Sequence, residues 1–201
     1  MNDLDESYFE NVVFENEIFS STHFVGKHFD GCLFDKCEMS ESIFDDCTFL
    51  DCRFVGCNLS LIKIPNSQMG NSIFTDCKMI GIDWTAGLWR KSTSKVVSRF
   101  PIVFSGCVLN YSIFMAMNLS GVRFTNCVLH DVGFESSNLS NSDFDTSDLR
   151  GALFSGTNLT RANFSRATNY SICVMDNITS KAKFSMPEAA ALLYALDIVI
   201  E

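Results

Sequence analysis

Cysteine and histidine have the greatest capacity for chemistry in this 201-residue chain, which contains nine cysteines and three histidines. A zinc site pairs cysteines two to four residues apart, usually with histidine. No Cys-x-x-Cys motif occurs here. Eight cysteines are separated from one another by five residues or a multiple of five: Cys32, Cys37, Cys47, Cys52, Cys57, Cys77, Cys107 and Cys127. Only Cys173 departs from this spacing. Elsewhere serine and alanine take the same positions. The spacing therefore predicts small buried core residues in a reducing compartment, with no metal and no cofactor.

The histidines do not indicate catalysis. His23, His28 and His130 are scattered, and all fall on positions that face outward in the repeat described below. The sequence contains no P-loop, GxGxxG, GxSxG or HExxH motif. Nucleophilic catalysis would need a serine or cysteine beside a histidine and an orienting group in a cleft. We therefore expect no catalytic residues and interpret the protein as a non-enzyme.

The cysteine spacing belongs to a five-residue repeat that runs through most of the chain. Its third position is large and apolar and the position two before it is small, as throughout Ser137–Ala167. Eighteen of the nineteen phenylalanines occupy the third position, and only Phe100 is out of phase. Within Phe29–Trp84 and Phe104–Phe164, neither position carries a charge. Positions one and three therefore face inward, and this short fixed period is typical of a solenoid.

This pattern resembles the pentapeptide-repeat family, whose consensus is Ala-Asp/Asn-Leu-X-X. The resemblance covers about residues 9–167 and implies an all-β solenoid, a right-handed quadrilateral β-helix with four pentapeptides in each coil. Thirty-two central positions would then give about eight coils and a rod of about 38 Å at the usual spacing between strands. Side chains twenty residues apart would stack. We expect one ladder of Phe14, Phe34, Phe54 and Phe74, and a second of Phe104, Phe124, Phe144 and Phe164.

The repeat is interrupted between Thr85 and Val103. Two positions there that would be central are Ser94 and Arg99, which cannot be core residues, so at least part of the segment leaves the solenoid. One interpretation is a surface loop or short helix. The other is a partner-contacting element, because loops on rigid scaffolds often carry function. The segment also carries four basic residues: Arg90, Lys91, Lys95 and Arg99.

After the repeat, Ser185-Met-Pro-Glu188 has the pattern of a capping box and predicts a short α-helix over about Pro187–Leu196. One role for this helix is to shield the last coil. The tail after it is strongly apolar, which favours pairing with a second copy through Ala189, Leu192, Leu193, Leu196, Ile198 and Ile200. We therefore divide the chain into an N-terminal tail at 1–8, a β-helix at 9–184 interrupted at about 85–103, and a C-terminal capping and dimerisation segment at 185–201.

Charge narrows the class of partner. A net charge of −9 and a pI near 4.7 argue against direct binding to nucleic acid or an anionic membrane. No apolar run approaches the ~18 residues of a membrane span, and the N-terminus lacks the pattern of a signal peptide, so we expect a cytoplasmic protein. Residues 9–60 hold ten acids against three bases, a local charge density close to that of duplex DNA. The candidate partner contacts are the four basic residues of the interruption together with Asp30, Asp35, Glu38, Glu41, Asp45, Asp46 and Asp51.

Three segments carry a closer resemblance: CNLSLIKIP at 57–65, DCKMIGIDW at 76–84 and FSMPEAAALL at 184–193. They are similar to the topoisomerase-protecting branch of the pentapeptide-repeat family, which includes albicidin-resistance, Qnr-like quinolone-resistance and microcin-immunity proteins. The resemblance implies a homodimer that mimics DNA, binds DNA gyrase or topoisomerase IV, and protects it from an antibiotic or toxin. The alternative is a pentapeptide-repeat scaffold that binds a different protein, with acidity serving only solubility.

Overall fold

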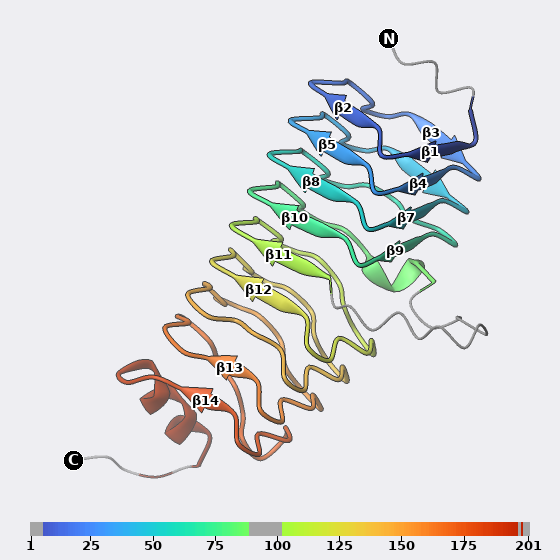
Figure 1. Cartoon of the computed structure of the whole chain (residues 1–201). Coiled ribbons are helices and arrows are strands. Elements are labelled where there is room, and N and C mark those ends of the chain that lie inside the picture. Colours follow the sequence, from blue (N-terminus) through green and yellow to red (C-terminus); the bar gives the residue numbers. More distant parts are fainter. Residues whose placement is uncertain (1–5, 89–101, 197, 199–201) are drawn as a thin grey trace.

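The computed structural model describes residues 6–88, 102–196 and 198, which form a rod of stacked coils (Figure 1). A regular coil contains twenty residues, because Phe34 pairs in parallel register with Phe14 in the coil before it and with Phe54 in the coil after it. Each coil has four sides of five residues. The predicted right-handed quadrilateral β-helix is therefore confirmed.

The four sides are numbered in the order in which the chain forms them. Side 1 contains β1 (Tyr8–Glu10), β4 (His28–Asp30), β7 (Thr48–Leu50) and β9 (Gln68–Gly70). Side 2 contains β2 (Val13–Glu15), β5 (Leu33–Asp35), β8 (Arg53–Val55), β10 (Ile73–Thr75), β11 (Val103–Ser105), β12 (Arg123–Thr125), β13 (Asn163–Phe164) and β14 (Lys183–Phe184). Side 3 is joined by single bridges, such as those of Glu38 with Asn58 and of Val108 with Val128. Side 4 begins with β3 (His23–Val25) and β6 (Ile43–Asp45) and continues through single bridges.

From Asn11 to Gly81 and from Gly106 to Arg166, each corner is made by a residue in the left-handed backbone conformation, two residues after the central position. Asn11 has a φ of 54° and Gly31, one coil later on the same corner, has a φ of 61°. Glycine, asparagine and aspartate adopt this conformation at least cost, which explains why they recur at the fifth position of the repeat. The corners therefore turn the chain by ninety degrees or so without a longer loop.

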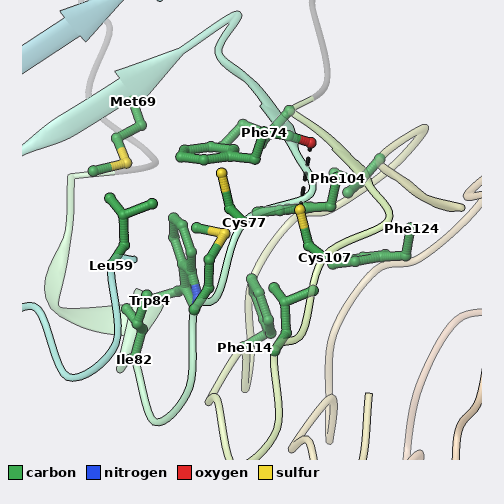
Figure 2. Close-up of a cluster of buried hydrophobic side chains, with 14 of the residues drawn as sticks. Leu59, Met69, Phe74, Cys77, Ile82, Trp84, Phe104, Cys107, Phe114 and Phe124 are labelled. Carbon is green, nitrogen blue, oxygen red and sulfur yellow. Dashed lines mark hydrogen bonds between the residues drawn. The ribbon is translucent and has the colours of Figure 1, made fainter. Parts of the chain in front are cut away.

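Phenylalanine rings on side 2 form one continuous ladder through the core. Neighbouring rings lie 4.7–5.3 Å apart with interplanar angles of 4–13°, in the order Phe14, Phe34, Phe54, Phe74, Phe104, Phe124, Phe144, Phe164 and Phe184. Figure 2 shows Phe74, Phe104 and Phe124 in this stack. The two predicted ladders are thus a single one, because the interruption of the repeat falls on a different side of the coil. Its eight steps make a rod of about 40 Å, close to the length predicted from the spacing of strands.

The interruption adds ten residues to one coil. Phe54 and Phe74 pair at a separation of twenty residues, whereas Phe74 and Phe104 pair at a separation of thirty. The addition equals two repeats, so the phase resumes unshifted. Its start coincides with the 3₁₀ helix η1 (Trp84–Ala86), and the predicted end was slightly late, because Val103 already lies in β11. Ser94 and Arg99 lie outside the described residues.

The C-terminal helix differs from the prediction. It is the 3₁₀ helix η2 (Glu188–Leu196) at the far end of the rod from β1, and the predicted α-helix is wrong (Figure 1). The N–H of Ala190 donates to the carbonyl of Pro187, three residues back, as in the tight turns that are common at chain ends. The capping box is also wrong, because the Ser185 hydroxyl accepts a hydrogen bond from the N–H of Arg166 in the previous coil. The helix nevertheless covers the last coil, since Leu192 packs against the core.

Candidate functional site

The outer surface of the first coils holds the carboxylates that the sequence singled out, and the repeat positions them. Within a strand such as β5 or β6 the central phenylalanine is buried and its two neighbours face outward. The side chains of Asp35 and Asp45 are therefore half-buried, whereas those of the corner residues Glu41, Asp46 and Asp51 are exposed. Acid at these positions leaves the core packing unchanged.

The structure does not bring these carboxylates together on one face. Asp30 lies on side 1 in β4, and Asp35 lies on side 2 in β5. Asp45 lies on side 4 in β6. Glu38 and Glu41 lie on side 3, Asp46 follows Asp45 at its corner, and Asp51 follows β7. These seven predicted acidic contacts therefore form a belt around the rod. The predicted basic contacts lie outside the described residues: Arg90, Lys91, Lys95 and Arg99.

Asparagines of the following coil hold three carboxylates of the belt. The Asn58 amide donates to Glu38 at 3.0 Å, and the Asn66 amide donates to Asp45 at 3.3 Å. Asn71 donates in the same way to Asp51. Neutral amides fix these oxygens without cancelling their charge, so the belt is a preorganised array of negative groups.

Glu38 is the most strongly engaged member of the belt. One carboxylate oxygen accepts from Asn58 and the other accepts from the N–H of Ser40 at 3.1 Å. Burial raises the pKa of Glu38, but these hydrogen bonds outweigh burial, so the pKa lies below its ordinary value. The ionised form is therefore the stable one on side 3.

Carboxylates in the last coils have a different environment. Two ion pairs lie after β12: Asp145 contacts Arg166, and Asp148 contacts His130. Two carboxylates of the last coils are therefore paired with basic side chains, and sequence position alone could not reveal this pairing.

His130 lies in a network that sequence reasoning missed. Arg150 donates to His130 Nδ1 at 2.9 Å, so the proton of the ring lies on Nε2, which donates to Asp148 Oδ2 at 2.8 Å. Burial raises the pKa of Asp148, but hydrogen bonds from Asn169 and His130 lower it by more. The pKa of Asp148 therefore lies below its ordinary value. His130 is therefore held in one tautomer on side 3, and its side chain is partly shielded from solvent.

The cysteines fill the core as predicted. All eight in the repeat are buried, and Cys173 is half-buried. Five of them stack in one column behind side 3, and each thiol donates to a carbonyl of the previous coil, as Cys107 does to Phe74 at 3.4 Å (Figure 2). Burial raises the pKa of the Cys52 thiol to about 12. Among the described residues, no three histidine, cysteine or acidic side chains gather in a way that could hold a metal ion.

The C-terminal residues predicted to pair with a second copy are divided between two environments. Leu192 packs against the core of the last coil, and Ala189 is half-buried. Leu193, Leu196 and Ile198 are exposed, and Ile200 lies outside the described residues. Only the exposed group is free to contact a partner. Within the described part of the chain, no helix is long and apolar enough to cross a membrane.

Comparison with known families decides the classification. The model of the pentapeptide repeat region matches residues 27–97 and 102–164, which is most of the chain. The chain belongs to the pentapeptide-repeat family. Members of this family are typically non-catalytic scaffolds for interaction.

Solved structures of other proteins are similar to this chain at low sequence identity. HetL, a pentapeptide-repeat protein involved in heterocyst differentiation regulation in the cyanobacterium Nostoc sp. strain PCC 7120, is 15% identical with a TM-score of 0.52, and the match covers 90% of this chain and 85% of HetL. A trypsin-treated form of QnrB1, a plasmid-mediated fluoroquinolone resistance protein, is 21% identical with a TM-score of 0.46, covering 96% of this chain and 91% of QnrB1. A search of curated proteins finds no match. The similarity to HetL shows the fold alone.

Proposed function

We propose that this protein mimics DNA, binds DNA gyrase or topoisomerase IV, and protects the enzyme from an antibiotic or toxin. The observation that carries the proposal is the belt of carboxylates on all four sides of the first coils. Three members are fixed by neutral asparagine amides, so the negative charge is held in place without being neutralised. A positively charged groove that binds duplex DNA would meet similar charge from several directions.

The shape of the rod supports the same proposal. Nine rings of the side 2 ladder stack in one unbroken series, and a core of close-packed coils resists bending. A stiff rod can enter a groove built for duplex DNA without losing conformational entropy. We further propose that the protein acts in the cytoplasm as a homodimer, joined through Leu193, Leu196 and Ile198.

The test is a gyrase supercoiling assay with and without a poison such as a fluoroquinolone. The protein at micromolar concentration should reduce the cleaved DNA that the poison produces, or inhibit supercoiling itself. A variant with Glu41→Gln, Asp46→Asn and Asp51→Asn should lose most of this effect. The matched control is Asp131→Asn with Asp176→Asn, two exposed acids of the later coils, which should retain it.

The alternative function is a scaffold for a different protein partner. It is favoured if neither gyrase nor topoisomerase IV responds to the wild-type protein in the assay above. Direct binding to each purified enzyme by surface plasmon resonance separates the two proposals, because a scaffold for another partner would bind neither.

A further inference from the structure

Side 4 changes its character along the rod. Near the N-terminal end it carries Asp45, Asp46 and Asp83 with Lys63. In the later coils four of its outward residues are large and apolar: Ile113, Met115, Leu153 and Met175 are between 39% and 75% exposed. Single bridges join Ile113 to Gly133 and Gly133 to Leu153, so these residues lie on adjacent coils. The four apolar residues together with Gly133 and Glu135 are called the side 4 patch below.

Glu135 is the charged residue of the side 4 patch, and its carboxyl group is recessed in it. The Oε2 atom is shielded from solvent and has no hydrogen-bond partner among the described residues. It lies over Gly133, where a Cβ atom would come within 2.9 Å of Oε2 and 3.6 Å of Met115 Cγ. The absence of a side chain at Gly133 therefore creates the notch that the carboxyl group occupies.

A buried oxygen without a hydrogen bond is costly, and a donor that reached it would recover that cost. The donor would arrive beside apolar side chains, because Met115, Ile113 and Leu153 lie on adjacent coils of the same side. An arginine or lysine has an apolar stem and a charged head, and it suits this arrangement.

We propose that the side 4 patch binds another protein through an arginine or lysine set among apolar residues, with the cation donating to Glu135. A second copy of this chain does not fit as the occupant, because a symmetric contact through the patch would bring two Glu135 carboxyl groups together. An anionic membrane surface does not fit either, since it would repel the same group. The acids Asp45, Asp46 and Asp83 on the same side would attract further basic residues of the partner. The proposal holds whether or not the partner is a topoisomerase.

The experiment uses the eight methionines of the chain as reporters. Protein labelled with ¹³C at the methionine methyl groups is titrated with hexylguanidinium, which combines a cation with an apolar chain, and separately with the neutral hexylurea. Hexylguanidinium should shift the resonances of Met115 and Met175 and bind about fivefold more tightly than hexylurea. Met186, which is 76% exposed outside the patch, should not respond. Equal affinity for the two compounds, or an equal response of Met186, would overturn the proposal.

Two variants assign the effect to the notch. Glu135→Gln keeps the size of the side chain and should remove the preference for hexylguanidinium. Gly133→Ala should weaken the binding of hexylguanidinium by displacing the carboxyl group, and the φ of Gly133 is not in the left-handed region, so alanine fits the backbone. Thermal melting of both variants confirms that they fold. A preference that persists in folded Glu135→Gln protein would contradict the role of this residue.

Discussion

Phe74 and Phe104 stack with ring centroids 5.2 Å apart and planes at 13°, although thirty residues separate them in the chain. On side 4 the rings of Trp84 and Phe114 stack in the same way at 5.4 Å. The core thus passes the interruption without a break. The ten added residues fall between Trp84 and Phe104, and both stacks continue from one side of them to the other.

Deletion of residues 90–99 should therefore leave the fold intact. The shortened coil would have the twenty residues of a regular one, and a shorter loop is entropically easier to close. We expect a cooperative thermal transition within about 5 °C of the wild-type midpoint, measured by circular dichroism. Loss of the transition would show that these residues are part of the core.

The ladder itself should be far less tolerant than the interruption. Phe104→Ala leaves a cavity between Phe74 and Phe124 and should reduce the free energy of unfolding by about 3–5 kcal/mol, as measured by denaturant titration. Phe184→Ala, at the half-buried end of the same ladder, is the matched comparison and should cost less. Equal losses at the two sites would contradict the continuous core.

The thiols should resist modification in the folded protein. Burial raises the pKa of Cys52 to about 12, so little thiolate forms there between pH 7 and pH 9. A thiol reagent such as DTNB should react quickly only with the half-buried Cys173, and with all nine cysteines in denaturant. Cys173→Ser should abolish the fast phase. Rapid reaction of several thiols in native conditions would mean that the coils open readily.

Acid should weaken the network around His130. The pKa of Asp148 is lower in the folded protein than in the unfolded chain, so the unfolded chain binds more protons in acid. The contribution of Asp148 is present above the unfolded value, near pH 4, and is lost as the pH falls through the folded value. Asp148→Asn should lower the melting temperature at pH 7, and the difference from wild type should shrink below about pH 4. Asp131→Asn, an exposed acid on the same side, controls for the removal of one charge.

The two adjacent leucines of η2 should respond differently to charge. Leu193→Asp should convert the proposed dimer to a monomer in light scattering with little change in stability, because Leu193 is exposed. Leu192→Asp should destabilise the last coil, because Leu192 packs against the core. A dimer mass that survives Leu193→Asp would show that η2 only caps the rod.

The sequence predicted the inside and outside of this molecule well and the grouping of its surface poorly. The five-residue period predicts which side chains are buried, and Phe34 and Cys57 are buried as it predicts. The side on which a residue lies depends instead on its position within the twenty-residue coil. That position puts Asp35 on side 2 and Asp45 on side 4.

The last coil shows a second limit of the repeat as a predictor. Asn169 holds the central position by phase, but it adopts a left-handed backbone with a φ of 57°, and Tyr170 is buried next to it. The ring of Tyr170 packs against Phe164 and Phe184. Val174, which keeps the phase, is only half-buried. Shielding of the rod end overrides the local period here, and side-chain orientations such as that of Glu135 depend on neighbours from other coils.

The preserved phase across the interruption makes this position a natural attachment point. Leu88 is anchored by its N–H to the carbonyl of Ser67, and Ile102 accepts from the N–H of Arg123, so both flanks are held by regular coils. A foreign peptide grafted between them would be displayed from a rigid support without any redesign of the core. The fold thus separates the part of the chain that must be kept from a part that can be exchanged.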